Sequence, residues 1–210
     1  MDKFFNSENP VMRFLSRIVD LVVLNVITIL YSLPVITLGG ALAAMNYVLV
    51  HFVKGDETYI IRMFRKSFRE NFKQGIPEGL LVLAIAGITA VDLLALHGSE
   101  SRAATLIMFM VTIFAVMLFV TCVYMFALQS RYENTISGTI LNAVRLAVGN
   151  LPRSAGIAII WLIWILILVY LYKAASLFFL IFGLSLPGYL CTLVYIRIFD
   201  NLESEEESQE

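Results

Sequence analysis

The stretch IVDLVVLNVITILYSLPVITLGGALAAMNYVLVHFV, residues 18–53, is apolar almost throughout. One helix over these residues would be about 54 Å long, whereas the hydrocarbon core of a bilayer is about 30 Å thick. Pro34 disfavours helix at Leu33, and the pair Gly39-Gly40 loosens the backbone. We therefore predict two membrane spans, at 18–33 and 35–53, joined by a tight turn on the outer face.

The rest of the chain also consists largely of long apolar runs. Hydrophobic residues make up 60% of the 210 residues and charged residues 15%, and the mean hydropathy is +0.84. The apolar runs are near the roughly 20 residues that a spanning helix needs, and they do not alternate as barrel strands would. The further spans are predicted at 77–97, 103–128, 155–172 and 176–199. The sequence thus predicts an all-α polytopic membrane bundle with six spans, in one domain covering 1–199.

The basic residues fall mainly on one side of this arrangement. With six spans, thirteen of the fifteen Lys and Arg residues lie in segments of one side, and only Arg102 and Lys173 lie on the other. Cytoplasmic segments collect Lys and Arg, so both termini are predicted to be cytoplasmic. The net charge of −1 hides this polarity, because the last residues, 200–210, form an acidic tail that we expect to be disordered.

Two cytoplasmic segments have an amphipathic helical period rather than a spanning one. In 59–72, apolar residues recur every four positions between basic ones; in 136–151, an apolar stripe ends at Gly149-Asn150. The apolar positions are Ile60, Phe64, Phe68 and Phe72 in the first, and Ile136, Ile140, Leu141, Val144, Ala147, Val148 and Leu151 in the second. We expect two helices lying at the membrane interface.

These two segments also align with each other. Placing Asn71 on Asn150 superimposes an amphipathic segment, a basic turn and a following span, which is consistent with an internal repeat. The alternative is that any multi-pass protein with two long cytoplasmic loops resembles itself in this way.

No residue pattern in the sequence indicates catalysis. A phosphate-binding glycine loop, a His/Cys/Asp cluster with metal-ligand spacing and a serine nucleophile motif are all missing. Cys122 and Cys191 both fall inside predicted spans and are expected to be buried small residues rather than a disulfide or metal ligands. We therefore expect no enzymatic activity, no catalytic residues, no cofactor, no metal and no nucleic-acid partner.

Polar residues inside the spans are the main candidates for an intramembrane site, because burying them in lipid is costly. Asp20 follows Arg17 by three residues, which predicts a local ion pair. Asp92 lies near the outer end of the third span, within reach of interfacial water. Asn25 and Asn46 can hydrogen-bond across the first hairpin, and we expect them to serve helix packing.

Four segments resemble the YesL family of bacterial membrane proteins. They are FFNSENPVMRFLSRIVDLVVLNVITILYSLPVITLGGA (4–41), FRKSFRENFKQG (64–75), LNAVRLAVGNLPRS (141–154) and YIRIFD (195–200). The similarity extends over nearly the whole chain, and the length agrees. The function of that family is unknown, but its members typically occur with carbohydrate ABC importers and glycan-degrading enzymes.

The resemblance implies an accessory role in sugar uptake, in the bacterial plasma membrane. The leading hypothesis is a non-enzymatic subunit that binds the permease of a carbohydrate ABC importer within the bilayer. The two amphipathic segments are the candidate partner surfaces, with Phe64, Phe68 and Arg145 as the candidate contacts. The alternative is an independent sugar carrier built from the internal repeat. The sequence does not determine the oligomeric state.

Overall fold

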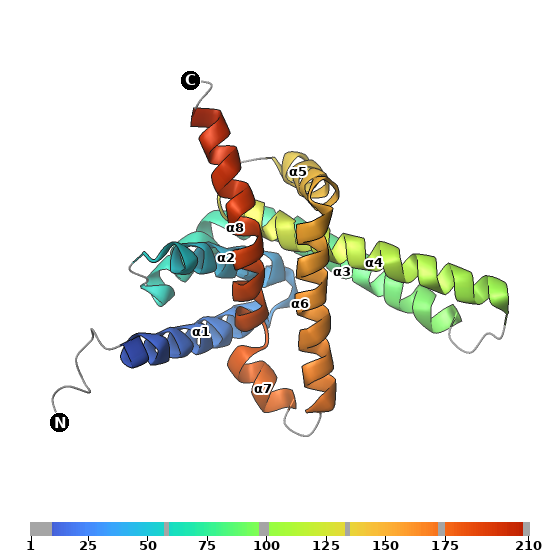
Figure 1. Cartoon of the computed structure of the whole chain (residues 1–210), viewed down its shortest axis with the longest axis horizontal. Coiled ribbons are helices and arrows are strands. Elements are labelled where there is room, and N and C mark those ends of the chain that lie inside the picture. The colour runs from blue at the N-terminus through green and yellow to red at the C-terminus, as the bar shows by residue number, and fades with distance from the viewer. Residues whose placement is uncertain (1–9, 57–58, 97–100, 133–134, 172–174, 208–210) are drawn as a thin grey trace.

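The computed structural model describes residues 10–56, 59–96, 101–132, 135–171 and 175–207, and this part of the chain is helical, with short turns and no strand (Figure 1). The elements are α1 (Pro10–Ser32), a 3₁₀ turn η1 (Val35–Thr37), α2 (Leu38–Lys54), α3 (Ile60–Leu96), α4 (Arg102–Gln129), α5 (Ile136–Gly149), α6 (Leu151–Tyr170), α7 (Ala175–Phe182) and α8 (Ser185–Glu207). The predicted all-α class is confirmed.

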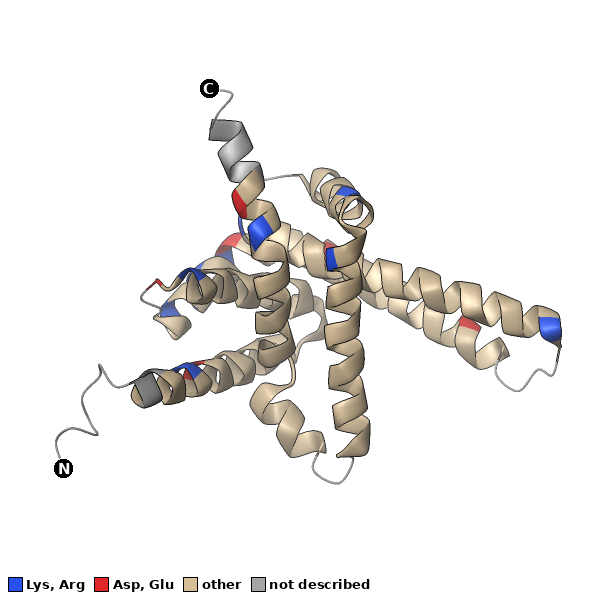
Figure 2. Cartoon of the chain, in the orientation of Figure 1, with Lys and Arg blue, Asp and Glu red and all other residues tan. Residues whose placement is uncertain are grey.

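Among the described residues, five helices are long and apolar enough to cross a bilayer. They lie at Phe14–Ser32, Val35–Lys54, Ile60–Leu96, Arg102–Gln129 and Leu151–Tyr170. α7 and the following helix over Ser185–Asn201 give a sixth span if they count as one, but they are bent by 48° where they meet. Figure 2 shows the long uncharged stretches of α4, α6 and α7 that such spans require.

Glycine contacts between α2 and α3 set the geometry of the first hairpin. Gly39 and Gly40 lie inside α2, rather than loosening the turn as expected, and they pack against Gly75 and Gly79 of α3. A Cβ built on Gly79 would lie 2.8 Å from the Gly39 nitrogen. Gly75 and Gly79 are four residues apart, the spacing that lets helix backbones approach closely in membranes.

The segment 59–72 is not a separate interfacial helix, because α3 runs without interruption from Ile60 to Leu96. Its 37 residues are about 55 Å long, more than one crossing needs. Pro77 lies inside it and has no N–H to donate to the carbonyl of Lys73. The glycine contacts and the aromatic contacts of Phe64 and Phe68 hold this first half of α3 along the hairpin.

The turn of the hairpin therefore lies beside the middle of α3. The sequence places this turn on the same outer face as the α3–α4 turn, but seventeen residues, about 26 Å of helix, separate Gly79 from Leu96. The two turns therefore lie at different positions along α3 in this structure. The physical cause is the close contact of the four glycines.

The second half of α3 and the first half of α4 form an arm that extends away from the other helices (Figure 1). The buried residues of α4 all lie from Val120 onwards, at the inner end of the arm. In the most apolar stretch of each of these two helices, only 6% of the residues are buried.

Asp200 of α8 lies beside the ends of α2 and α4. Its Oδ1 is 3.6 Å from Nζ of Lys54, the last residue of α2, and 3.9 Å from Nη2 of Arg131, which follows α4. The charge pattern assigns the ends of α2, α4 and α8 to one side of the membrane, and this contact brings them together. Beyond Asp200, α8 continues to Glu207, so the first eight residues of the tail that was expected to be disordered, 200–207, are helical.

The predicted amphipathic helix over 136–151 is present as α5, which ends at Gly149 as expected. Thr135 caps it, because its Oγ1 accepts the N–H of Gly138 at 3.2 Å. The buried face differs from the predicted stripe: Thr139, Ala143 and Ala147 face inward. These small residues let α5 lie close to α4, so Leu141, Val144 and Val148 stay exposed.

Candidate functional site

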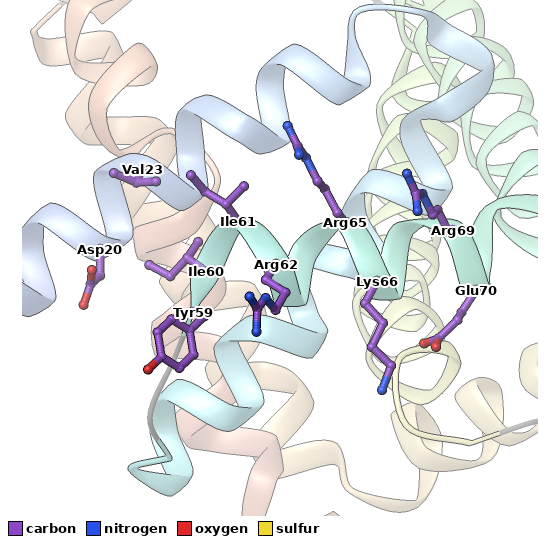
Figure 3. Close-up of a pocket in the computed structure, with 10 residues that line it drawn as sticks. All are labelled: Asp20, Val23, Tyr59, Ile60, Ile61, Arg62, Arg65, Lys66, Arg69 and Glu70. Atoms are coloured by element: carbon purple, nitrogen blue, oxygen red, sulfur yellow. The ribbon is translucent and has the colours of Figure 1, made fainter.

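A basic cleft lies between α1 and the first half of α3 (Figure 3). Its volume is about 820 Å³. Figure 3 shows Asp20 and Val23 projecting from α1, while the first turns of α3 carry the basic side chains. The lining residues are Asp20, Val23, Tyr59, Ile60, Ile61, Arg62, Arg65, Lys66, Arg69 and Glu70.

The cations of this cleft have no carboxylate partner in the part of the chain that the structure describes. No ion pair within 4 Å involves Arg62, Arg65, Lys66 or Arg69 there. Arg62 lies over the ring of Tyr59, 5.8 Å from its centroid. The cleft is therefore a polar, positively charged surface with room for an anionic group.

The predicted ion pair between Arg17 and Asp20 is not formed. The guanidinium of Arg17 lies instead over the ring of Phe52, 5.6 Å from its centroid, and so joins α1 to α2. Asp20 is half-buried and lines the basic cleft.

Two of the three predicted partner contacts are used inside the molecule. Phe64 is fully buried, and Phe68 is half-buried. Their ring centroids lie 5.2 Å and 4.8 Å from that of Tyr31, in edge-to-face contacts with the end of α1. Phe64 is therefore not available to a partner. Arg145 is exposed on α5, and its role stays a prediction.

Asn25 holds the break between α7 and α8. Its Oδ1 accepts the N–H groups of Leu184 and Ser185 at 2.8 and 3.1 Å, and its Nδ2 donates to the carbonyls of Phe179 and Leu180 at 2.9 and 2.8 Å. One fully buried amide thus satisfies backbone groups on both sides of the bend. The sequence predicts a hydrogen bond of Asn25 across the first hairpin, and this bond is not formed.

The indole of Trp164 supports the same break, because its Nε1 donates to the carbonyl of Gly183 at 3.0 Å. This leaves the side chain buried rather than facing lipid.

Asn46 also bonds to α8 rather than across the hairpin. Its Oδ1 accepts the hydroxyl of Tyr195 at 2.8 Å, its Nδ2 donates to Leu42 O at 2.9 Å, and Thr192 Oγ1 lies 2.9 Å from the same hydroxyl. All three side chains are buried. Asn46 therefore ties α2 to α8.

Asp92 lies exposed near the outer end of α3, on the arm. It borders a shallow depression with Leu83, Gly87 and Val91. The structure does not bring it near Asp20, Asn25 or Asn46, so the four predicted polar residues do not form one site.

Glu78 is the buried ionisable residue that the sequence analysis missed. Its side chain is fully buried, and Oε1 accepts Nε2 of Gln74 at 3.0 Å. With the amide of Gln129 oriented so that its nitrogen faces the carboxylate, Gln129 donates to Oε2 at 2.8 Å. Gln74 also donates to Thr139 Oγ1 at 3.1 Å. The carboxylate is thus the hub between α3, α4 and α5.

A signal for this hub was present in the sequence. Glu78 stands between Gly75 and Gly79, and an acid inside a pair of closely packing glycines faces a neighbouring helix. Because the third span is predicted to start at 77, Glu78 was expected in the headgroup region, where water can hydrate a carboxylate.

Two clefts along the spanning helices are apolar. One, of about 440 Å³, lies between α4 and α6 at the base of the arm; the other, of about 320 Å³, lies between α3 and α4. The first is lined by Thr112, Ile113, Val116, Met117, Val120, Leu151, Ser154, Ala155, Ala158 and Ile159. Such surfaces suit acyl chains or another protein's helix better than a sugar.

In the described part of the chain, no group of three or more His, Cys, Asp or Glu side chains is placed to hold a metal ion. Cys122 and Cys191 are free thiols, half-buried and buried. The network around Glu78 and the network around Asn46 hold helices together and contain no arrangement of nucleophile and base.

Residues 21–93 match the family model described as "Protein of unknown function, DUF624". No curated protein and no solved structure matches the chain significantly. The matched region covers the second half of α1, all of α2 and most of α3, and so includes the glycine contact, Glu78 and the lining of the basic cleft except Asp20.

Proposed function

We propose that this chain is a non-enzymatic accessory subunit of a bacterial carbohydrate ABC importer, which binds the importer's permease within the plasma membrane. The resemblance to YesL proteins supplies the type of importer. The observation that supports a binding role is the arm of α3 and α4, which extends away from the remaining helices (Figure 1). At its base, an open apolar cleft lies between α4 and α6.

The partner surface in this proposal is the cleft between α4 and α6. Ile113 and Ile159, on opposite walls, expose 50% and 54% of their surfaces. A spanning helix of the permease can lie between the two walls and bury both, with close packing as the main stabilising contribution. The exposed apolar side chains of α5 and the adjacent Arg145 extend this surface on the basic side of the molecule.

The alternative, an independent carrier, is favoured by one feature, the discontinuous helix at Gly183. Carriers often bind substrate at such breaks, where free backbone groups face the solute. Here Asn25 and Trp164 already bond those backbone groups. The apolar linings of the α3–α4 and α4–α6 clefts also give few hydrogen-bonding groups to a sugar. These observations weigh towards the accessory subunit.

Copurification tests the proposal. Tagged protein extracted from its native host in mild detergent is expected to carry an ABC permease and its ATPase, identified by mass spectrometry. A control extraction of an unrelated tagged membrane protein of similar abundance identifies carry-over. Recovery of the chain alone, together with sugar uptake by liposomes that contain it, would move the assignment to the carrier.

A further inference from the structure

The carboxyl group of Glu78 is buried without a cation beside it. The side chain lies fully buried between α3, α4 and α5, and no ion pair within 4 Å involves it among the described residues. The side chains bonded to its two oxygens are the neutral amides of Gln74 and Gln129. Removing an ionised carboxylate from both water and cations is far more unfavourable than removing the neutral acid. Burial therefore favours a bound proton on Glu78.

The titratable side chains of the surrounding helices form no hydrogen bond or ion pair with Glu78 in the part of the chain that the structure describes. The nearest of them along each helix are Glu70 and Lys73 on α3, Tyr47, His51 and Lys54 on α2, Cys122, Tyr124 and Arg131 in or just after α4, and Arg145 on α5. Glu70, Lys73 and Arg145 are exposed, and Arg131 lies 3.9 Å from Asp200. Those of α2 lie in its second half, beyond the glycine contact. The charge of Glu78 is thus compensated only by neutral groups.

The amide of Gln129 can bond either form of Glu78. One terminal atom of this amide lies 2.8 Å from Oε2 of Glu78. The other lies 3.1 Å from the nitrogen of Gly75 and 3.3 Å from the carbonyl oxygen of Asn71. With its nitrogen toward Glu78, the amide donates to an ionised carboxylate, and its oxygen accepts the N–H of Gly75. With its oxygen toward Glu78, it accepts the O–H of the neutral acid, and its nitrogen donates to Asn71.

The remaining bonds of the site tolerate both orientations of the amide. Gln74 donates to Oε1 of Glu78 in either state, so the position left for the proton is Oε2. When Gln129 donates to Asn71, the N–H of Gly75 keeps its bond to the same carbonyl, four residues earlier in α3, because a carbonyl oxygen has two lone pairs. Turning one amide over therefore converts the site between its neutral and its ionised form.

We propose that Glu78 is a proton-binding site, in which a proton on Oε2 is donated to the oxygen of Gln129 and its release turns the Gln129 amide toward Gly75. The released proton passes to water, and no other group changes its charge. Gln129 is the last residue of α4, and Asn71 and Gly75 belong to α3. The proton thus changes the hydrogen bonds that join α3 to the end of α4, where the chain leads into α5.

Infrared difference spectroscopy of the full-length protein in detergent, titrated from about pH 5 to about pH 10, tests this proposal. We expect the wild type to keep one carboxylic-acid C=O band at about pH 7, where exposed carboxyl groups are ionised, and to lose it as the pH rises. Glu78→Gln should lack this band, although it keeps the shape of the neutral acid and both amide partners. Glu70→Gln, at an exposed position of the same helix, is the matched control and should keep the band.

A second variant separates the role of Gln129 from the effect of burial. Gln129→Met removes a donor that matters most to the ionised form, because hydrogen bonds to charged groups are the stronger ones. Glu78 should then bind its proton about tenfold more tightly, so the band should disappear about one pH unit higher.

NMR of the wild type with carbon-13 at its glutamate carboxyl groups follows the same titration and needs no substitution. Absence of the band at about pH 7, its persistence in the wild type at about pH 10, or its presence in Glu78→Gln would each overturn the proposal. The same titration midpoint in the wild type and Gln129→Met would also overturn it.

Discussion

Gly39 of α2 and Gly79 of α3 touch through their backbones: a Cβ on Gly79 would lie 2.8 Å from the nitrogen and 3.2 Å from the Cα of Gly39. This contact, with Gly40 and Gly75 beside it, fixes the hairpin on the middle of α3. It therefore determines where the basic cleft and the arm lie relative to each other.

Replacing Gly79 by Ala is expected to destabilise the protein by about 1–3 kcal/mol, because the added methyl group must push the two backbones apart. Gly87 of the same helix is the control, since nothing lies within 4 Å of a Cβ built there. Gly87→Ala should be neutral or slightly stabilising. Thermal unfolding in detergent measures both, and equal melting temperatures for the two variants would contradict the contact.

Asn25→Leu is expected to cost on the order of 2–4 kcal/mol, because the Leu184 and Ser185 N–H groups lose their acceptor inside the bundle. Asn25→Asp keeps that acceptor but cannot donate to the Phe179 and Leu180 carbonyls, so an intermediate loss is expected. Asn142→Leu, at a half-buried position on α5, is the control. Chemical or thermal unfolding measures the stability of the three variants. An equal loss of stability in all three would contradict the role of Asn25 at the α7–α8 break.

Glu78→Leu is expected to cost about 1–3 kcal/mol, because it leaves the half-buried amide of Gln74 without its carboxylate acceptor. Glu70, two turns earlier on α3, is exposed and accepts no hydrogen bond of this kind in the described structure, so Glu70→Leu should change stability little. Limited proteolysis of the segment before α5 gives a second measurement, because the hub includes Thr139. If Glu78→Leu changed neither protease sensitivity nor stability, the Glu78 network would not be what holds α5 against α3 and α4.

The position of the hairpin turn predicts different accessibility for two engineered cysteines. In a background with Cys122→Ala and Cys191→Ala, a membrane-impermeant maleimide added outside intact cells should label Ser101→Cys, at the tip of the arm. Leu33→Cys should stay unlabelled, because the turn lies about 26 Å of helix away from that tip. Equal labelling from outside would mean that the hairpin reaches the outer face.

Much of the fold could be predicted from local sequence. The apolar runs identify the helices, and the Gly149-Asn150 signal correctly ends α5. Local sequence predicted the wrong helix bounds where contacts with a distant segment determine the structure. The polar residues in 59–72 predict a separate interfacial helix, yet Tyr31 and the glycines of α2 hold these residues in one continuous helix with the span that follows.

The candidate site was less predictable for the same reason. Asn25 and Asn46 were correctly selected as residues for helix packing, but their partners lie about 150 positions away, on the carbonyls and hydroxyl of α7 and α8. No periodicity in the sequence indicates which distant helix a buried amide will meet. The spacing of Gly75 and Gly79, by contrast, was a readable signal for close packing and so for the burial of Glu78.

Site-specific photo-crosslinking tests the proposed accessory role most directly. A photoreactive phenylalanine analogue in place of Ile113, in the cleft between α4 and α6, is compared in the native host with the same analogue in place of Leu193, an exposed apolar residue of α8 outside that cleft. The account predicts a crosslink to an ABC permease from position 113 and none from position 193. Crosslinks to lipid alone from both positions, in cells that express the importer, would contradict it.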